Sequence, residues 1–163
     1  MRSVISIFSF FLLLVYYSCT VSPGFSETPS IEFLGLSKDS LNQDNLFSDS
    51  IFLTISFRDG DGDLGTGADG VFENVRITDN RTGELYDRFR IPPLDIAGSM
   101  TGIEGRMTLK LFTTCCRFPD GTPPCLAPEE FPTNNLSLDI QMIDDSGNES
   151  NMVTTSLITL LCN

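Results

Sequence analysis

The 163-residue chain has no histidine, no tryptophan and few basic residues. Without histidine it lacks the commonest general base and the usual nitrogen ligand of zinc and copper. Ten lysines and arginines stand against 22 aspartates and glutamates, a formal net charge of −12, which excludes a nucleic-acid backbone as partner. The absence of tryptophan leaves few flat platforms on which a sugar could stack.

Recognisable catalytic motifs are also missing. The chain has no glycine-rich phosphate loop and no Gly-x-Ser-x-Gly nucleophile turn. Paired carboxylates could in principle hydrolyse glycosides, but an acidic chain offers many accidental pairs. We therefore predict that the protein is not an enzyme, with a hydrolase as a distant alternative.

The one long hydrophobic run lies at the N-terminus. Residues 4–17 are apolar apart from two serines, and Ser18 and Cys19 follow. This run is shorter than the roughly 20 residues that a membrane-spanning helix needs, so we predict a signal peptide over residues 1–18. A small residue directly before a cysteine resembles the lipobox of bacterial lipoproteins, which implies lipidation of Cys19.

Acyl chains on Cys19 would attach the protein to a membrane, because so acidic a chain is not drawn to anionic lipid by itself. Thr20 follows, rather than the aspartate that retains lipoproteins in the inner membrane of enteric bacteria. We therefore expect the protein at the outer membrane, with its domain facing either the periplasm or the cell exterior. Residues 19–30 are rich in Ser, Thr, Pro and Gly and are predicted to form a flexible tether, and residues 31–163 the folded domain.

Within this domain apolar and polar residues alternate, as in half-buried strands. The alternation is clearest at 51–57 and 136–142, and weaker at 31–36, 74–79, 84–91, 104–113 and 152–161. Seven short strands separated by turn residues predict an all-β fold, an antiparallel immunoglobulin-like β-sandwich of about seven strands. A small barrel is the alternative.

Two acidic loops would meet at one end of such a fold. One loop covers residues 58–72 and the other residues 144–151. Because side chains two residues apart lie on the same face of a strand, Asp59 continues the buried line of Phe57, and Asp144 continues that of Met142.

Crowded carboxylates repel one another unless a cation lies between them, and calcium fits this chemistry. It takes six to eight oxygen ligands, and Asp-x-Asp-x-Asp spacing with intervening glycines lets three carboxylates converge. The predicted ligands are Asp59, Asp61, Asp63, Asp144 and Asn148, with Asp69 and Asp145 as weaker candidates. Leu64 directly after the third aspartate, and Gly70 in place of a bidentate glutamate, exclude an EF-hand. A solvated Asp/Gly turn is the alternative.

Together with the leader, the stretches ISFRDGDGDLG (55–65) and DDSGNESN (144–151) resemble a family of uncharacterised Bacteroidota lipoproteins that carry a bacterial Ig-like domain. Residues 144–148 match the Asp-x-x-Gly-Asn turn found between the last two strands of related surface modules. The resemblance implies a cell-envelope location and an Ig-like fold, and it adds little about activity.

Four further cysteines are predicted at the end opposite the acidic loops. An even number in an exported chain favours disulfides. A bond between the neighbours Cys115 and Cys116 would strain the backbone, so two pairings remain open. These are Cys115–Cys125 with Cys116–Cys162, or Cys115–Cys162 with Cys116–Cys125.

These features predict a lipid-anchored cell-envelope protein that acts as a structural or binding module, is stabilised by calcium, and has an envelope protein or a glycan as partner. A calcium-dependent carbohydrate-binding module at the cell surface is the main alternative.

Overall fold

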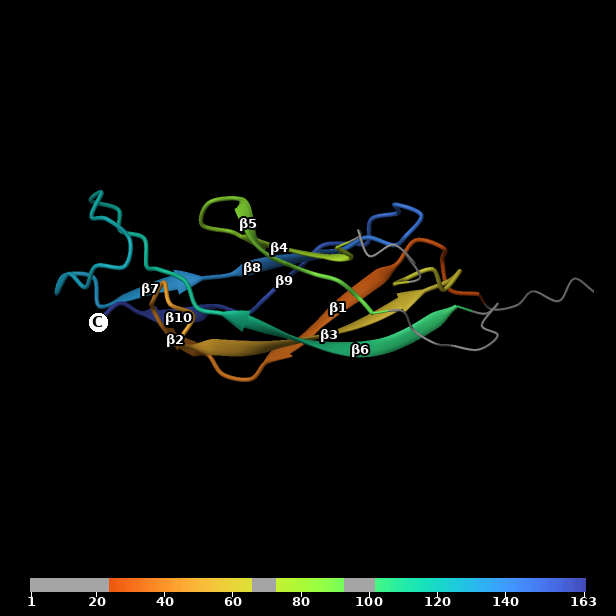
Figure 1. Cartoon of the computed structure of the whole chain (residues 1–163), viewed down its shortest axis with the longest axis horizontal. Coiled ribbons are helices and arrows are strands. Elements are labelled where there is room, and N and C mark those ends of the chain that lie inside the picture. Colours follow the sequence, from red (N-terminus) through yellow and green to blue (C-terminus); the bar gives the residue numbers. More distant parts are fainter. Residues whose placement is uncertain (1–23, 66–72, 93–101) are drawn as a thin grey trace, which may run out of the picture.

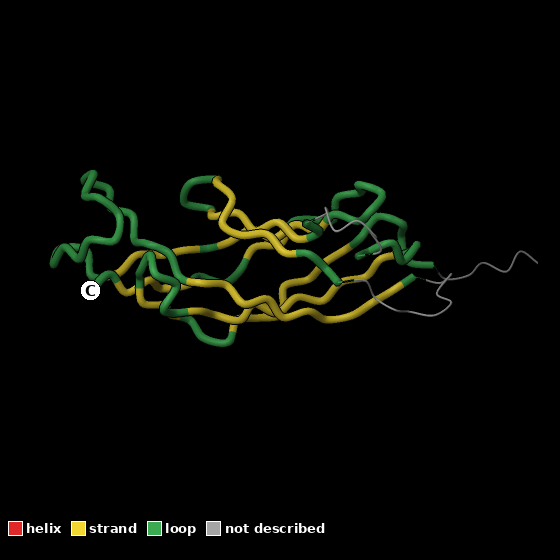
Figure 2. The backbone as a smooth tube through the Cα atoms, viewed as in Figure 1, coloured by secondary structure: helices red, strands yellow, loops and turns green. Residues whose placement is uncertain are grey.

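The computed structural model describes residues 24–65, 73–92 and 102–163, and the regular elements in these ranges are strands (Figure 1). They are β1 (Ser30–Leu36), β2 (Ser40–Asn42), β3 (Ser50–Asp59), β4 (Val75–Asp79), β5 (Glu84–Phe89), β6 (Ile103–Phe112), β7 (Thr133–Leu136), β8 (Leu138–Met142), β9 (Val153–Thr154) and β10 (Ile158–Leu161). Across these ranges the chain consists of strands and loops (Figure 2), with no helix long and apolar enough to cross a membrane. The predicted signal peptide (residues 1–18), Cys19 and Asp69 lie outside the described residues.

The strands form three sheets. One is antiparallel with the order β1-β3-β6, and a second is antiparallel with the order β5-β4-β8-β9. In the third, β10 pairs with β2 in parallel and with β7 in antiparallel orientation. Figure 1 shows the first two sheets as facing layers, with the third near the C-terminus. Among the described strands, β5 and β6 each pair on one side only, so the sheets do not close into a barrel.

Apolar and polar residues alternate along the strands, so the apolar faces of the two layers pack together and form the core. In β3, Ile51, Leu53 and Ile55 are fully buried, whereas Phe52 and Arg58 on the other face are exposed. Burying such an aliphatic side chain contributes roughly 1.5–3 kcal/mol relative to leaving it in water. A shift of the strand pairing by one residue would expose all the apolar side chains of this face, so the alternation determines which face of β3 is buried.

The predicted all-β class is confirmed, but the count of about seven strands is wrong, because the described residues already form ten strands. The segments 136–142 and 152–161 are each divided in two, and β2 was not predicted. The first division has a physical cause: β7 pairs with β10, whereas β8 pairs with β4 and β9, so the chain changes sheets between them. At this crossing the hydroxyl of Thr155 accepts a hydrogen bond from the backbone N–H of Leu138 at 3.1 Å.

The four cysteines lie at the end that holds the C-terminus, which we call the cysteine end. Cys115 is bonded to Cys125 and Cys116 to Cys162, with Cα–Cα distances of 4.7 and 5.9 Å. This is the first of the two pairings that the sequence left open. The second disulfide ties the segment after β6 to the residue that follows β10.

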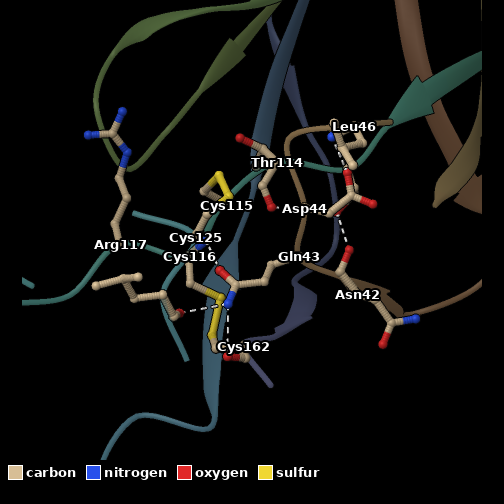
Figure 3. The surroundings of a disulfide bond; sticks show 12 residues. Asn42, Gln43, Asp44, Leu46, Thr114, Cys115, Cys116, Arg117, Cys125 and Cys162 are labelled. Carbon is tan, nitrogen blue, oxygen red and sulfur yellow. Dashed lines mark hydrogen bonds between the residues drawn. A yellow bond between two sulfur atoms is a disulfide. The ribbon is translucent and has the colours of Figure 1, made fainter. Parts of the chain in front are cut away.

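Gln43 connects the chain segments around this second disulfide (Figure 3). Its amide nitrogen donates to the carbonyl oxygens of Leu126 and Cys162, both at 2.8 Å, and its amide oxygen accepts from the backbone N–H of Cys116 at 2.9 Å. Both polar ends of the side chain therefore have partners.

An ion pair completes the cysteine end. Arg81 Nη2 lies 2.7 Å from Asp79 Oδ2, and Arg81 Nη1 donates to Asn134 Oδ1 at 2.7 Å and to the carbonyl oxygen of Cys115 at 3.3 Å. Burial alone would raise the pKa of Asp79, but the hydrogen bonds and charge of Arg81 outweigh it and hold that pKa below its usual range.

Candidate metal centre

Strand β3 directs its last residue, Asp59, into the interior. Asp59 lies in line with the buried Phe57, as its position in the strand predicts, and is 0% exposed. The chain then curls through residues 59–65, which we call the aspartate loop. Gly62 and Gly65 have φ angles of 72° and 74°, in the left-handed region that glycine adopts without strain. The sequence therefore combines an inward-facing carboxylate with a tightly curled loop.

Asp144 comes from the opposite layer, two residues after Met142, the last residue of β8. It lies in line with the buried Met142, as predicted, and is 1% exposed. Asn148 holds its carboxylate from the far side of the turn: the backbone N–H donates to Oδ1 at 2.7 Å and the side-chain amide to Oδ2 at 2.8 Å. Gly147, at a φ of 89°, lets the chain reverse between them. The second acidic loop (residues 144–151) thus fixes Asp144 in place.

Four carboxylates from the two loops converge on one point. Asp59, Asp61, Asp63 and Asp144 each offer one oxygen atom, and these four atoms lie within 4.8 Å of one another. Two unit charges 4 Å apart repel by about 1 kcal/mol in water and about 4 kcal/mol at an effective dielectric constant of 20. The cluster could therefore hold a metal ion, which would replace this repulsion by attraction.

Asp59 is the most strongly perturbed member of the aspartate cluster. Among the described residues, neither of its buried carboxylate oxygens has a hydrogen-bond partner of normal geometry. Its pKa is raised to about 6, chiefly by burial and further by the negative charges of Asp61, Asp63 and Asp144, whereas the backbone N–H of Asp63 acts in the opposite direction. A polar group buried in this way is destabilising unless something compensates for it.

The environment of Asp63 is more balanced. Burial raises its pKa, and the charges of Asp144 and Asp61 act in the same direction, while hydrogen bonds from the side chain and backbone of Ser146 lower it. Ser146 belongs to the second acidic loop, so a contact between the loops supports Asp63. The two loops therefore meet at the carboxylates and also contact each other through Ser146 and Asp63.

Asn74, which sequence reasoning missed, joins three segments beside the cluster. Its side-chain amide donates to Asp145 Oδ1 and to the carbonyl oxygen of Ile143, both at 3.2 Å, and its oxygen accepts from the backbone N–H of Ile91 at 3.2 Å. Asn74 is buried, just before β4. A buried amide at the start of a strand is the signal that would have identified it, but burial cannot be seen in one sequence.

The structure thus brings together four of the predicted ligands, Asp59, Asp61, Asp63 and Asp144. It places Asn148 against Asp144 and Asp145 against Asn74, each through hydrogen bonds. Comparison with known proteins adds no identity, because no protein-family model, curated protein or solved structure matches the chain. The site is interpreted from its own geometry.

Proposed function

We propose that the protein is a lipid-anchored module of the cell envelope, stabilised by calcium bound between Asp59, Asp61, Asp63 and Asp144, and that it supports or binds a partner rather than catalysing a reaction. The buried carboxylate of Asp59, which has no hydrogen-bond partner of normal geometry among the described residues, carries this proposal. An ionised carboxylate in such a position costs several kcal/mol unless a positive charge offsets it. A divalent cation at the centre of the cluster would remove that cost.

Calcium suits these ligands better than other biological cations do. The cluster is built of carboxylate oxygens, the chain has no histidine, and the four described cysteines are held in disulfides. Zinc and copper favour nitrogen and sulfur ligands, and magnesium usually keeps several waters in a strict octahedron. Calcium accepts the irregular arrangement of oxygens that two loops provide.

The order of the strands supports an immunoglobulin-like sandwich. The order β1-β3-β6 corresponds to A-B-E of one immunoglobulin sheet, and β5-β4-β8-β9 corresponds to C′-C-F-G of the other. In this assignment, β7 and β10 continue strands F and G toward the cysteine end. The two acidic loops are then the B–C and F–G loops, which lie at the same end of such a sandwich.

Lipid on Cys19 would attach the domain to the membrane at the end that carries the aspartate cluster. Ser30 begins β1 opposite Arg58, next to Asp59, so the chain enters the domain beside the cluster. Labelling with radioactive palmitate, beside a Cys19→Ser variant, tests the anchor. Label that persists undiminished in the variant would refute it.

Calcium binding is tested most directly by isothermal titration calorimetry. The wild type should bind calcium, and Asp61→Asn should weaken the affinity about tenfold or more, because it removes one ligand charge from the most exposed cluster residue. Asp120→Asn is a matched control: it removes one exposed aspartate charge from the loop near the cysteine end. Equal losses in both variants, or no binding in the wild type, would contradict the proposed site.

A carbohydrate-binding role is a second candidate, favoured by a groove at the cysteine end. The groove, of about 600 Å³, lies between the hairpin of β4 and β5 and the end of β6. Phe47, 64% exposed, and Phe112 line it in an edge-to-face pair, beside the polar side chains of Glu84 and Arg117. Aromatic faces beside charged groups suit sugars. The groove and the aspartate cluster lie at opposite ends of β3, because Ser50 pairs with Phe112 at one end and Asp59 with Ile103 at the other. Unlike the calcium-dependent binding expected from the sequence, glycan-array binding in this groove should therefore persist in chelator, and it should disappear in Phe47→Ala.

A further inference from the structure

Gly60, in the aspartate loop, lies at a crossing of three chain segments. Its backbone N–H donates to the carbonyl oxygen of Ser26 at 2.8 Å. A Cβ atom on Gly60 would lie 2.2 Å from the carbonyl oxygen of Phe25 and 2.5 Å from that of Ser26, so only glycine permits this approach. Gly102 also packs closely against this loop, because a Cβ there would lie 2.6 Å from the carbonyl oxygen of Asp59.

The chain that approaches Gly60 is the N-terminal segment (residues 24–29), and a second contact holds it to the end of β3, directly before the same loop. The guanidinium of Arg58, one residue before Asp59, lies 5.6 Å from the centre of the Phe25 ring. Such a cation–π contact contributes about 0.5–1 kcal/mol at an exposed site. Phe25 is 39% exposed, so its ring lies against Arg58 at the surface and does not enter the core.

The second acidic loop holds the chain just beyond this segment. Asn151 accepts a hydrogen bond from the backbone N–H of Ile31 and donates one to the carbonyl oxygen of Ile31, both at 2.9 Å. The two loops that supply the carboxylates therefore also hold the chain where it enters β1. One backbone conformation of residues 59–61 places two carboxylates in the cluster and the Gly60 N–H against Ser26.

We infer that the N-terminal segment is a calcium-dependent latch: it closes on the aspartate loop when the cluster holds calcium and is released when the cation leaves. This inference rests on the proposed calcium site and adds a regulation to it. Without the cation, repulsion among Asp59, Asp61 and Asp63 drives the loop to open, and opening the loop separates Gly60 from Ser26. By thermodynamic linkage, closing the latch strengthens calcium binding by the same factor by which calcium strengthens closure.

A tryptophan introduced into the N-terminal segment would report the position of the latch by its fluorescence. The chain has none, so Phe25→Trp in the full-length protein gives one emission signal while keeping an aromatic ring over Arg58. Calcium should shift this emission, with a midpoint that matches the dissociation constant measured by calorimetry on the same variant. Calcium binding with unchanged emission would overturn the latch and leave the calcium site intact. Absence of calcium binding would overturn both.

If calcium strengthens closure of the latch, then disrupting the latch must weaken calcium binding, and substitutions at two glycines test this. Gly60→Ala forces the loop and the N-terminal segment apart, whereas Gly24→Ala adds a methyl group that meets nothing within 4 Å. We expect Gly60→Ala to weaken calcium binding at least fivefold, the low end of typical coupling, and Gly24→Ala to leave it unchanged. Phe25→Ala leaves the loop sequence intact and should produce a smaller loss in the same direction. Wild-type affinity in both Gly60→Ala and Phe25→Ala would refute the coupling.

Discussion

The two ends of the molecule are stabilised in opposite ways. At the cysteine end the constraints are complete within the chain: two disulfides, a glutamine with both polar ends bonded, and an aspartate paired with an arginine. At the other end four carboxylates converge, and the most buried of them, Asp59, has no hydrogen-bond partner of normal geometry among the described residues. The comparison indicates that one end is stabilised by bonds within the chain, whereas the other presents a group of carboxylates that could hold a metal ion.

The largest expected effect comes from the disulfides of the cysteine end. In the chain-entropy model, the Cys116–Cys162 bond, with a sequence separation of 46, contributes about 4 kcal/mol, and the Cys115–Cys125 bond, with a separation of 10, about 3 kcal/mol. Serine substitution of each pair, followed by urea unfolding, measures both. We expect the larger loss for the first pair. A larger loss for the second pair would contradict the account of this end.

The next effect is a pH dependence at the cluster. Asp59 has a pKa of about 6 in the folded protein and an ordinary value of 3.8 when unfolded. The folded state therefore retains a proton that the unfolded chain releases, so in chelator the free energy of unfolding should fall as the pH rises from about 4 to about 6. We expect a loss of about 1–3 kcal/mol, measured by urea unfolding across this range. In Asp59→Asn the dependence should flatten, and an unchanged slope would contradict this assignment.

The cysteine end should respond to pH in the opposite direction. The pKa of Asp79 is lowered in the folded protein, so its contribution to stability is complete above the ordinary aspartate range and is lost as the pH falls through and below it. Asp79→Asn should reduce the acid sensitivity of the wild type in the same urea experiment. Acid sensitivity that stays undiminished in the variant would show that the Arg81 pair is not its source.

A smaller effect is expected from the residue that positions Asp144. Asn148→Ala removes the side-chain hydrogen bond at 2.8 Å but keeps the one from the backbone. Hydrogen bonds to charged groups contribute about 1.5–3 kcal/mol to stability, and the remaining bond should keep the loss in the free energy of unfolding near the lower value. Calorimetry should show weaker calcium binding than in the wild type but stronger binding than in Asp61→Asn. A loss equal to that of Asp61→Asn would indicate that Asn148 is itself a ligand.

Much of the cluster could be predicted because it depends on local periodicity. Alternation in β3 and β8 was sufficient to place Asp59 and Asp144 on the inward faces, where the structure has them. The division between β7 and β8 could not be predicted, because Leu136 and Leu138 are both buried and the alternation continues through Ser137. What changes at that point is the pairing partner, which is a long-range property.

Other features depend on contacts between distant segments and leave no local pattern. Strand β2 is only three residues long and pairs in parallel with β10, near the other end of the chain. The glycine at position 60 looks like an ordinary loop residue until Phe25 and Ser26 are placed against it. Asn151 is likewise unremarkable in sequence, and its two bonds to Ile31 span 120 positions.

The most direct test of the central claim is thermal unfolding of the wild type with excess calcium and with chelator, beside Asp61→Asn. At a calcium concentration a hundredfold above the dissociation constant, binding adds about 2.7 kcal/mol to the free energy of unfolding. For a domain of this size, that raises the melting temperature by roughly 2–6 °C. The account predicts this rise in the wild type and its loss in Asp61→Asn. Equal melting temperatures of the wild type in millimolar calcium and in chelator would contradict it.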